Sequence, residues 1–190
     1  INTLLNMSLT KTPICNFGEK AKNFNLLSTE NRKLSLNDVK GENGTLIMFI
    51  CNHCPYVKAV IKDIVRDANT LENIGIKTTA IMSNDVKNYP EDSFENMISF
   101  SKFHAFAFPY LIDDTQEVAK EYGAVCTPDF FGYNKNLELQ YRGRIKELKN
   151  LKPVRKGESD LLAAMKQIAE SGAGPKNQIP SMGCNIKWFK

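Results

Sequence analysis

The chain has 190 residues, of which 42% are hydrophobic and 24% are charged, the balance of one globular domain. The net charge of +4 is small, and the basic residues are scattered outside the segment 142–156, so the composition argues against nucleic acid as a partner. The longest apolar run, 46–50, is far shorter than the roughly 18 to 20 residues that cross a bilayer, so we expect no membrane partner either.

We predict a single domain over residues 1–190, with an N-terminal extension at 1–23 and a C-terminal tail at 172–190. The N-terminus lacks the basic start, the sustained apolar middle and the small-residue cleavage site of a secretory signal. Five cysteines are an odd number, which disfavours a framework of structural disulfides. We therefore expect reduced thiols and a cytoplasmic location.

The first half of the chain predicts a β-α-β unit. A short strand at 24–27 and a Gly-punctuated loop lead to the unbroken apolar run 46–50, which is typical of a strand covered on both faces. Apolar residues then recur at three- and four-residue steps from Asn52 to near Gly75, as on one face of an amphipathic helix. A second buried strand at 76–82 completes the crossover and implies a parallel pair.

The second half predicts helices, a further strand and a hairpin. A capping box of Asp92 and Glu95 predicts a helix that begins near Asp92. The elements expected after it are a strand in "FPYLIDD", a short helix closed by Gly123, a hairpin that turns at Asn134 to Asn136, and a last helix in "ESDLLAAMKQIAESGAG". This order predicts an α/β chain with a mixed central sheet and helices on both faces, as in the thioredoxin-like fold.

Two cysteines stand where the first buried strand gives way to the helix. A helix N-terminus offers unpaired N–H groups and a positive dipole end, so we expect the pKa of Cys51 to be lowered and its thiolate to be reachable. His53 adds positive charge between Cys51 and Cys54, and Pro55 fits a first helical turn. The pattern predicts disulfide exchange, in which Cys51 attacks and Cys54 resolves.

Two other interpretations of the pair stay open. In the first, the cysteines are packing residues. In the second, they are part of a zinc site that distant ligands complete. The sequence has no second CxxC and no HxxxH. We therefore predict no metal and no cofactor.

Polar residues elsewhere are candidates for substrate binding. Thr127-Pro128 precedes a strand, at the place where thioredoxin-like folds hold a cis proline against the cysteine pair and leave the preceding backbone to pair with a substrate strand. A trans proline that merely opens the strand is the alternative. Asn84 and Asp85 follow the second buried strand, so they either line the same crevice or form its turn.

Several stretches together resemble the thioredoxin-like redoxin (AhpC/TSA-type) superfamily and, within it, a peroxiredoxin-like subgroup that carries a CxxC. They are "MFICNHCPYVK", "SNDVKNYPEDSFENM", "FPYLIDDTQEVAKEYGAVCTPDFFGY", "YRGRI" and "GCNIKW", and they span about residues 13–190. The resemblance implies a thioredoxin-like fold and a thiol redox activity.

The chain departs from both of the family's better known patterns. Thr45 stands where thioredoxin has a buried Asp, so an Asp or Glu from a loop would have to accept the proton of the second thiol. Cys54-Pro55 is similar to the peroxidatic Cys-Pro of peroxiredoxins. However, Cys51 and Ile47 replace the Thr and Pro expected before it, which leaves peroxide activation incomplete.

The other cysteines have several interpretations. Cys126 lies two residues before Pro128 and is either a resolving thiol or a packing residue. Cys184, in a Gly-rich tail, could fold back on the site as a resolving thiol, pair with a second chain in a homodimer, or be inert. Cys15 belongs to no motif, and we expect it to be structural.

Three functions therefore stay open. The first is a thiol-disulfide oxidoreductase acting on a protein or small-molecule disulfide with a thiol reductant, and His53 would tune its cysteine pair. The second is a thiol peroxidase that reduces a peroxide. The third is a metal-binding or redox-sensing module without enzymatic activity.

Overall fold

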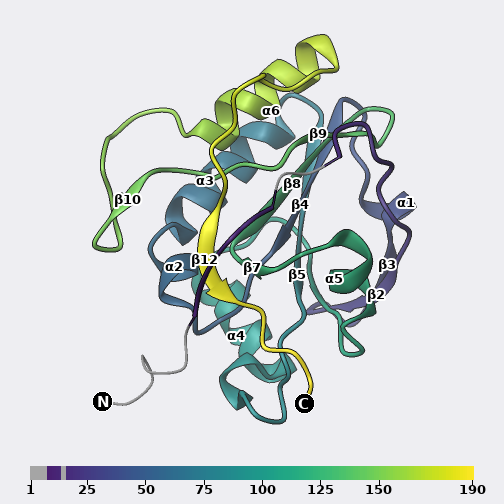
Figure 1. Ribbon diagram of the computed structural model, residues 1–190. Coiled ribbons are helices and arrows are strands. Elements are labelled where there is room, and N and C mark those ends of the chain that lie inside the picture. Colours follow the sequence, from purple (N-terminus) through teal and green to yellow (C-terminus); the bar gives the residue numbers. More distant parts are fainter. Residues whose placement is uncertain (1–7, 14–15) are drawn as a thin grey trace.

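The computed structural model describes residues 8–13 and 16–190 and is built around a seven-stranded mixed sheet with the order β3-β2-β6-β5-β4-β8-β9 (Figure 1). The strands of this sheet are β2 (Asn25–Ser28), β3 (Lys33–Ser35), β4 (Gly44–Phe49), β5 (Ile76–Met82), β6 (Tyr110–Ile112), β8 (Asp129–Asn134) and β9 (Leu139–Tyr141). The helices are α1 (Leu36–Val39), α2 (Pro55–Lys58), α3 (Ile61–Glu72), α4 (Phe94–Phe103), α5 (Glu117–Tyr122) and α6 (Asp160–Ser171), with a 3-10 turn η1 (Pro90–Asp92).

Strand β4 lies at the centre of the sheet and is buried along its whole length. It pairs in parallel with β5 and antiparallel with β8. Alternate side chains enter two separate apolar clusters, with Ile47 and Phe49 on one face and Leu46 and Met48 on the other. The predicted pair of buried parallel strands is confirmed.

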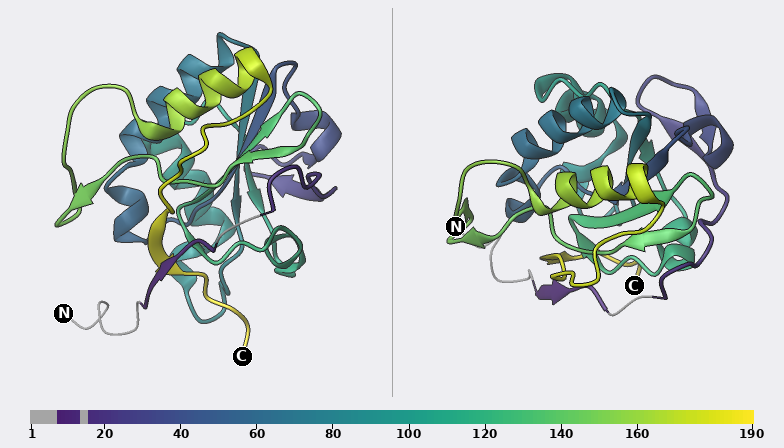
Figure 2. Two further views of the ribbon diagram at one scale, coloured as in Figure 1. Left: turned by 45° about the horizontal axis from the view of Figure 1, so that its top comes forward. Right: turned by 90° about the horizontal axis from the view of Figure 1, so that it is seen from above.

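Helices cover both faces of the sheet, as predicted. Residues of α3 and α6 enter the cluster that contains Met48, and residues of α1 and α5 enter the cluster that contains Phe49. Figure 2 shows α3 and α6 side by side on one face. The hairpin of β8 and β9 turns at Asn134 to Asn136, and α5 ends at Gly123, in agreement with the sequence pattern.

The helix expected to run from Asn52 to Gly75 is divided in two. Asn52 is held outside the helix because its backbone N–H donates to the Asp92 carboxylate and its side chain donates to the carbonyl of Glu91. The helix therefore begins at Pro55, directly after Cys54. A second break occurs at Val60, whose φ of −120° and ψ of 5° are not helical. Val60 is the N-cap of α3, which starts at Ile61.

The predicted cap at Asp92 is wrong. Ser93 is the N-cap of α4, because its hydroxyl accepts from the backbone N–H of Asn96. Asp92 is the last residue of the turn η1 and is fully buried. Its carboxylate therefore accepts hydrogen bonds from buried groups, namely the Asn52 backbone and the Asn84 side chain, and does not cap the helix.

The C-terminal segment forms a strand that crosses the molecule. β12 (Met182–Asn185) lies between β1 (Leu9–Lys11) and β7 (Cys126–Thr127), antiparallel to both. Figure 1 shows β12, in yellow, passing in front of the sheet beside β1, in purple. The extension and tail boundaries stay predictions, but the tail contains ordered structure that the sequence pattern did not indicate.

A small hairpin extends from the same side of the molecule. It consists of β10 (Leu148–Lys149) and β11 (Lys152–Pro153), and it contains Lys149 and Lys152, two of the basic residues that the sequence shows between 142 and 156. Within the described ranges, no helix is both long and apolar enough to span a bilayer.

A buried ion pair holds the start of β8 in place. Arg142 makes two parallel hydrogen bonds to Asp129, at 2.9 Å each, and donates to the carbonyl of Gly123. Its guanidinium also lies 4.0 Å from the centre of the Phe131 ring. Asp129 is one residue beyond Pro128, so this pair fixes the backbone that leads into the site.

We predict that Arg142→Met lowers the free energy of unfolding by about 3 to 5 kcal/mol, because it leaves the buried Asp129 carboxylate without its cation. Urea denaturation measures the change. Arg155→Met is the matched control, since Arg155 is exposed and pairs with Asp160 at the surface, and it should cost less than about 1 kcal/mol. Equal effects of the two substitutions would contradict the structural role of Arg142.

Candidate active site

The two cysteines of the CxxC lie at the carboxyl end of β4. Cys51 follows the strand, and Cys54 is the N-cap of α2, with Pro55 as the first helical residue. The backbone N–H of Val57, in the first turn of α2, is directed toward the Cys54 sulfur. The side chains are covered, with Cys51 1% exposed and Cys54 fully buried.

A third sulfur joins the pair. The Sγ atoms of Cys54 and Cys184 are 2.8 Å apart, which is contact but longer than the roughly 2.05 Å of a disulfide bond. Cys54 Sγ is also 3.3 Å from the Thr127 carbonyl oxygen, and Cys51 Sγ is 3.6 Å from the Thr127 hydroxyl. Three thiols and the Thr127-Pro128 segment therefore form one buried cluster.

The expectation that Cys51 is the ionised and reachable thiol is wrong. Burial raises the pKa of Cys51, and its hydrogen bond to Cys54 and the negative charge of Asp92 raise it further. Burial also acts to raise the pKa of Cys54, but hydrogen bonds from Cys184, Cys51, Thr127 and the Val57 backbone outweigh it, and the pKa of Cys54 is lowered. The helix N-terminus stabilises the second cysteine because α2 begins three residues later than the pattern indicated.

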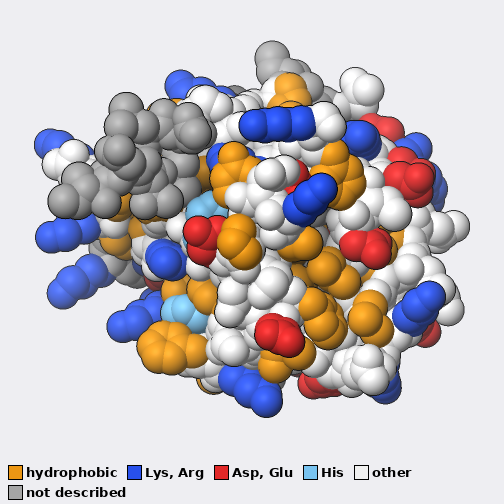
Figure 3. Space-filling view, turned by 90° about the horizontal axis from the view of Figure 1, so that it is seen from below, with side chains coloured by type: hydrophobic (Ala, Val, Ile, Leu, Met, Phe, Trp, Pro, Cys, Tyr) orange, Lys and Arg blue, Asp and Glu red, His pale blue; other side chains and the backbone are white. Residues whose placement is uncertain are grey.

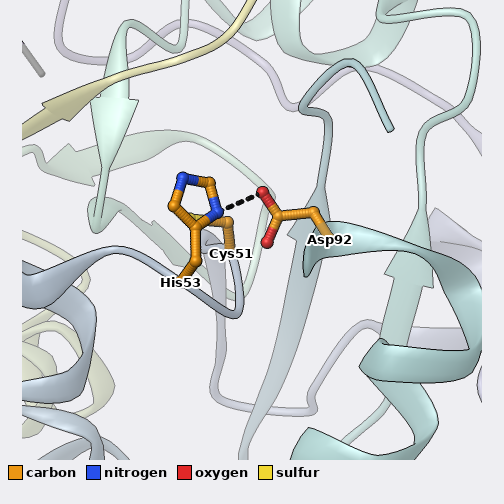
Figure 4. Close-up of side chains that lie close together, drawn as sticks. All are labelled: Cys51, His53 and Asp92. Carbon is orange, nitrogen blue, oxygen red and sulfur yellow. Dashed lines mark ion pairs between the residues drawn. The ribbon is translucent and has the colours of Figure 1, made fainter. Parts of the chain in front are cut away.

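His53 forms an ion pair with Asp92 beside the cysteines. The distance from His53 Nδ1 to an Asp92 carboxylate oxygen is 2.6 Å, and Figure 4 shows both side chains turned toward each other next to Cys51. Burial acts against the charged imidazole, but the hydrogen bond and charge of Asp92 outweigh it, so the pKa of His53 is raised.

The histidine links this cluster to solvent. The His53 side chain is 13% exposed, whereas Asp92 is fully buried. Histidine side chains are visible at the surface of the face seen in Figure 3. A proton that leaves the cluster can therefore pass through the imidazole.

A hydrogen-bond network positions the Asp92 carboxylate. One oxygen accepts from the Asn52 backbone N–H at 2.8 Å, and the other accepts from the Asn84 side chain at 3.0 Å. Asn52 in turn accepts from the Tyr110 hydroxyl at 2.8 Å. The loop between the cysteines and the end of β5 are thus both tied to Asp92.

Asn84 and Asp85 occupy different surroundings. Asn84 contacts the site through Asp92, and its side-chain oxygen accepts from the backbone N–H of Lys187. The Asp85 carboxylate accepts from the backbone N–H groups of Lys87 and Asn88, which is the turn-forming alternative. Their binding of substrate stays a prediction.

The Thr127-Pro128 bond is cis and lies against the cysteine pair, as the sequence indicated. The edge of β7 next to it, expected to be open for a substrate strand, is paired with β12 instead. Cys184 lies opposite Thr127 in the register, and Asn185 lies opposite Cys126.

The structure brings Cys184, and not Cys126, into contact with Cys54. Neighbouring residues of a strand point to opposite faces, and Thr127 faces the pair, so Cys126 faces away and its sulfur lies 3.6 Å from the Pro128 carbonyl. Burial and the charge of Asp129 raise the pKa of Cys126. Cys15 lies outside the described residues.

Sequence analysis missed Asp92 as a site residue, although it predicted that an acid from a loop would have to serve the second thiol. Asp92 and Glu95 match the capping-box pattern, whereas Ser93 is followed three residues later by Asn96, so the pattern favoured the wrong cap. The available signal was Tyr89-Pro90, because Pro90 opens the separate turn η1 that ends at Asp92.

One set of side chains in the described part of the chain has ligand types suited to a metal ion. A Cys51 sulfur, a His53 nitrogen and an Asp92 oxygen lie within 4.8 Å of one another. Both Asp92 oxygens already accept hydrogen bonds, and His53 is paired with that carboxylate, so the donors satisfy each other. The prediction that the site works without a metal is not tested by this geometry.

The central strand that ends in two cysteines, with a cis proline beside them, defines a thioredoxin-like redox protein that works through thiols. Residues 17–148 match the model of the AhpC/TSA family, and the chain belongs to that family.

Solved structures of related proteins agree with this assignment. An uncharacterized conserved protein from Geobacillus kaustophilus is 40% identical, with 96% of this chain and 97% of that chain covered and a TM-score of 0.91. A hypothetical protein from Sinorhizobium meliloti 1021 is 33% identical, with 95% and 98% covered and a TM-score of 0.88. The thioredoxin domain of a thiol-disulfide oxidoreductase from Bacteroides vulgatus, 15% identical with 68% and 91% covered and a TM-score of 0.57, shares the fold. No curated protein sequence matches the chain.

We predict that Asp92→Asn makes His53 titrate at a lower pH than in the unchanged protein, because the neutral amide no longer favours the imidazolium. NMR titration of the imidazole protons measures this. The stability that the charged pair supplies is present below the ordinary histidine pKa of roughly 6.5 and is lost as the pH rises through the raised value.

His104 is the internal control, since it is the only other histidine and burial with nearby Lys58 and Lys62 lowers its pKa. Its titration should not change in Asp92→Asn. A His53 curve that is also unmoved would show that the pair does not form in solution.

Proposed function

We propose that the protein is a thiol-disulfide oxidoreductase in which Cys54 carries the thiolate and Cys51 is the resolving thiol. The observation that supports this is the Cys54 sulfur at the start of α2, hydrogen-bonded by neighbouring thiols and a backbone N–H, with its pKa lowered. The roles of the two cysteines are thus the reverse of those that the sequence pattern indicated.

The reaction begins at the sulfur of Cys54. Its thiolate attacks one sulfur of a substrate disulfide, forms a mixed disulfide and releases the other sulfur as a thiolate, which takes a proton from solvent. Cys51 then loses its proton and attacks the Cys54 sulfur, which releases the second substrate thiolate and leaves a Cys51–Cys54 disulfide. Two thiols of an external reductant restore the dithiol.

The His53–Asp92 pair supports the second step. Cys51 has a raised pKa and must lose a proton before it attacks. The carboxylate of Asp92 and the imidazole of His53 lie within 4.8 Å of its sulfur, and His53 reaches solvent. Asp92 is the loop carboxylate that the chain needs in place of the acid missing at Thr45.

This proposal places the chain in the CxxC-containing, peroxiredoxin-like branch of its family. The same proposal includes a cytoplasmic location, where thiols stay reduced, and a soluble thiol reductant as the electron donor. It requires no metal and no cofactor.

We predict that the protein accelerates the reduction of insulin by dithiothreitol and that Cys54→Ser reduces the rate to that of dithiothreitol alone, because the attacking sulfur is gone. The double variant Cys51→Ser, Cys184→Ser should instead accumulate a mixed disulfide at Cys54, visible by mass spectrometry, since it lacks both the resolving thiol and the other thiol in contact with Cys54.

Cys126→Ser is the matched control, because this sulfur faces away from the pair, and it should keep most of the activity. Full activity in Cys54→Ser, or a mixed disulfide that accumulates at Cys51 in that variant, would reject the assignment.

A second candidate is a thiol peroxidase, favoured by the lowered pKa of Cys54 together with Pro55 at the first turn. A peroxide oxygen would then oxidise Cys54 to a sulfenic acid, and the adjacent Cys184 would condense with it to a disulfide and release water. The Thr127 hydroxyl is shared between the two thiols, since it lies 3.6 Å from the Cys51 sulfur and also hydrogen-bonds Cys54.

We predict peroxide consumption, coupled to dithiothreitol, no faster than that of free cysteine at equal thiol concentration, because Cys54 is fully buried and because Cys51 and Ile47 stand where peroxiredoxins have the Thr and Pro that activate a peroxide. A rate that exceeds this background by more than about a hundredfold, and that is lost in Cys54→Ser, would make peroxidase the primary function.

A further inference from the structure

Strand β12 occupies the place where a substrate strand would dock. We propose that β12 is a built-in substrate mimic, and that the site reacts faster with an extended polypeptide in which a glycine directly precedes the reacting cysteine than with other disulfides. This inference rests on the proposed disulfide exchange and adds to it the class of substrate and the reason why the sulfurs are buried.

The register of β12 is that of a bound substrate. Cys184 lies opposite Thr127, next to the cis proline, and the N–H of Ile186 donates to the carbonyl of Val125 at 3.1 Å. This antiparallel pairing places the Cys184 sulfur 2.8 Å from Cys54. A substrate sulfur must reach that position to be attacked.

The residue before the cysteine is constrained to be glycine. A β-carbon added at Gly183 would overlap the carbonyl oxygen of Thr127, and it would also lie 2.7 Å from the carbonyl carbon. Both atoms are backbone and cannot rotate away. Any other residue would push the following cysteine away from Cys54, so the same steric rule applies to an external strand in this register.

A groove beside Pro128 leaves room for the residues before the glycine. It has a volume of about 510 Å³, and the segment 179–182 of the chain lines it together with apolar side chains, namely Tyr56, Val60, Ile145, Leu148 and Leu151. This extended lining suits a polypeptide with apolar residues ahead of Gly-Cys, since a small disulfide would leave most of the groove unfilled.

Both ends of β12 are anchored, so its removal requires a local opening. The Ser181 hydroxyl donates to the Pro128 carbonyl at 2.7 Å, and the Lys187 carbonyl accepts from the Gln116 side chain at 2.9 Å. A substrate therefore competes with β12 for the edge of β7, and the exposure of Cys54 measures how often the strand leaves.

Gly183→Ala tests the mimic, with Gly174→Ala as the matched control. A β-carbon at Gly174 would overlap the Gln140 carbonyl oxygen. Both substitutions therefore change a glycine of the C-terminal segment and create a clash with a backbone carbonyl. Only Gly183 lies against the edge of β7. Alkylation of Cys54 by iodoacetamide, followed by mass spectrometry, should be at least about tenfold faster in Gly183→Ala than in the unchanged protein or in Gly174→Ala. Equal rates in all three proteins would overturn the proposal.

A second measurement does not depend on the folding of a glycine variant. The peptides Ser-Met-Gly-Cys-Asn-Ile-Lys and Ser-Met-Ala-Cys-Asn-Ile-Lys, each carrying thionitrobenzoate on its cysteine, are offered to the double variant Cys51→Ser, Cys184→Ser, in which no neighbouring thiol can resolve the product. The glycine peptide should form the mixed disulfide with Cys54 at least about tenfold faster than the alanine peptide. Equal trapping of the two peptides would overturn the glycine requirement.

The outcomes also separate this inference from the proposed function. Faster alkylation in Gly183→Ala without insulin reduction by any variant would support β12 as a cover and reject disulfide exchange. Insulin reduction at the same rate in the unchanged protein and in Gly183→Ala would support exchange and overturn the mimic.

Discussion

The close approach of β12 to β7 places a third sulfur against the cysteine pair. Because Gly183 has no side chain, the strand can lie against the Thr127 backbone and bring Cys184 into contact with Cys54. That contact excludes solvent from the CxxC, and it supplies one of the hydrogen bonds that lower the pKa of Cys54. Without β12, the edge beside the cis proline would be an open sheet edge of the kind that pairs with other strands.

The second determinant is the buried carboxylate of Asp92. It ties the loop between the cysteines to the end of β5, raises the pKa of His53 and adds to the effect of burial in raising the pKa of Cys51. The pKa values of the two thiols are thus shifted in opposite directions, as an attacking and a resolving thiol require. Opposite shifts of neighbouring groups are frequent at catalytic sites, since each group needs a pKa matched to its task.

The substrate mimic and the proposed exchange are linked by one physical constraint. A thiolate enclosed by its own chain is protected from nonspecific oxidation, but it must be uncovered before it can react. Competition between β12 and a substrate strand would couple the exposure of Cys54 to the arrival of the correct partner. Specificity then comes from the backbone pairing and the glycine position more than from any one side chain.

The local pattern of the sequence determined the architecture. Unbroken apolar runs predicted β4 and β5, and the three- and four-residue period predicted α3, because burial imposes these periods wherever an element packs on a core. The residues 127 and 128 predicted the cis proline by resemblance. Three features depended on contacts between residues that are 40 or more positions apart. The contact of Asn52 with Asp92 sets the start of α2 and the role of Asp92, and the pairing of Thr127 with Cys184 sets the position of Cys184. No local pattern encodes such contacts, so only the tertiary structure decided which of the two CxxC thiols is the acidic one and what covers it.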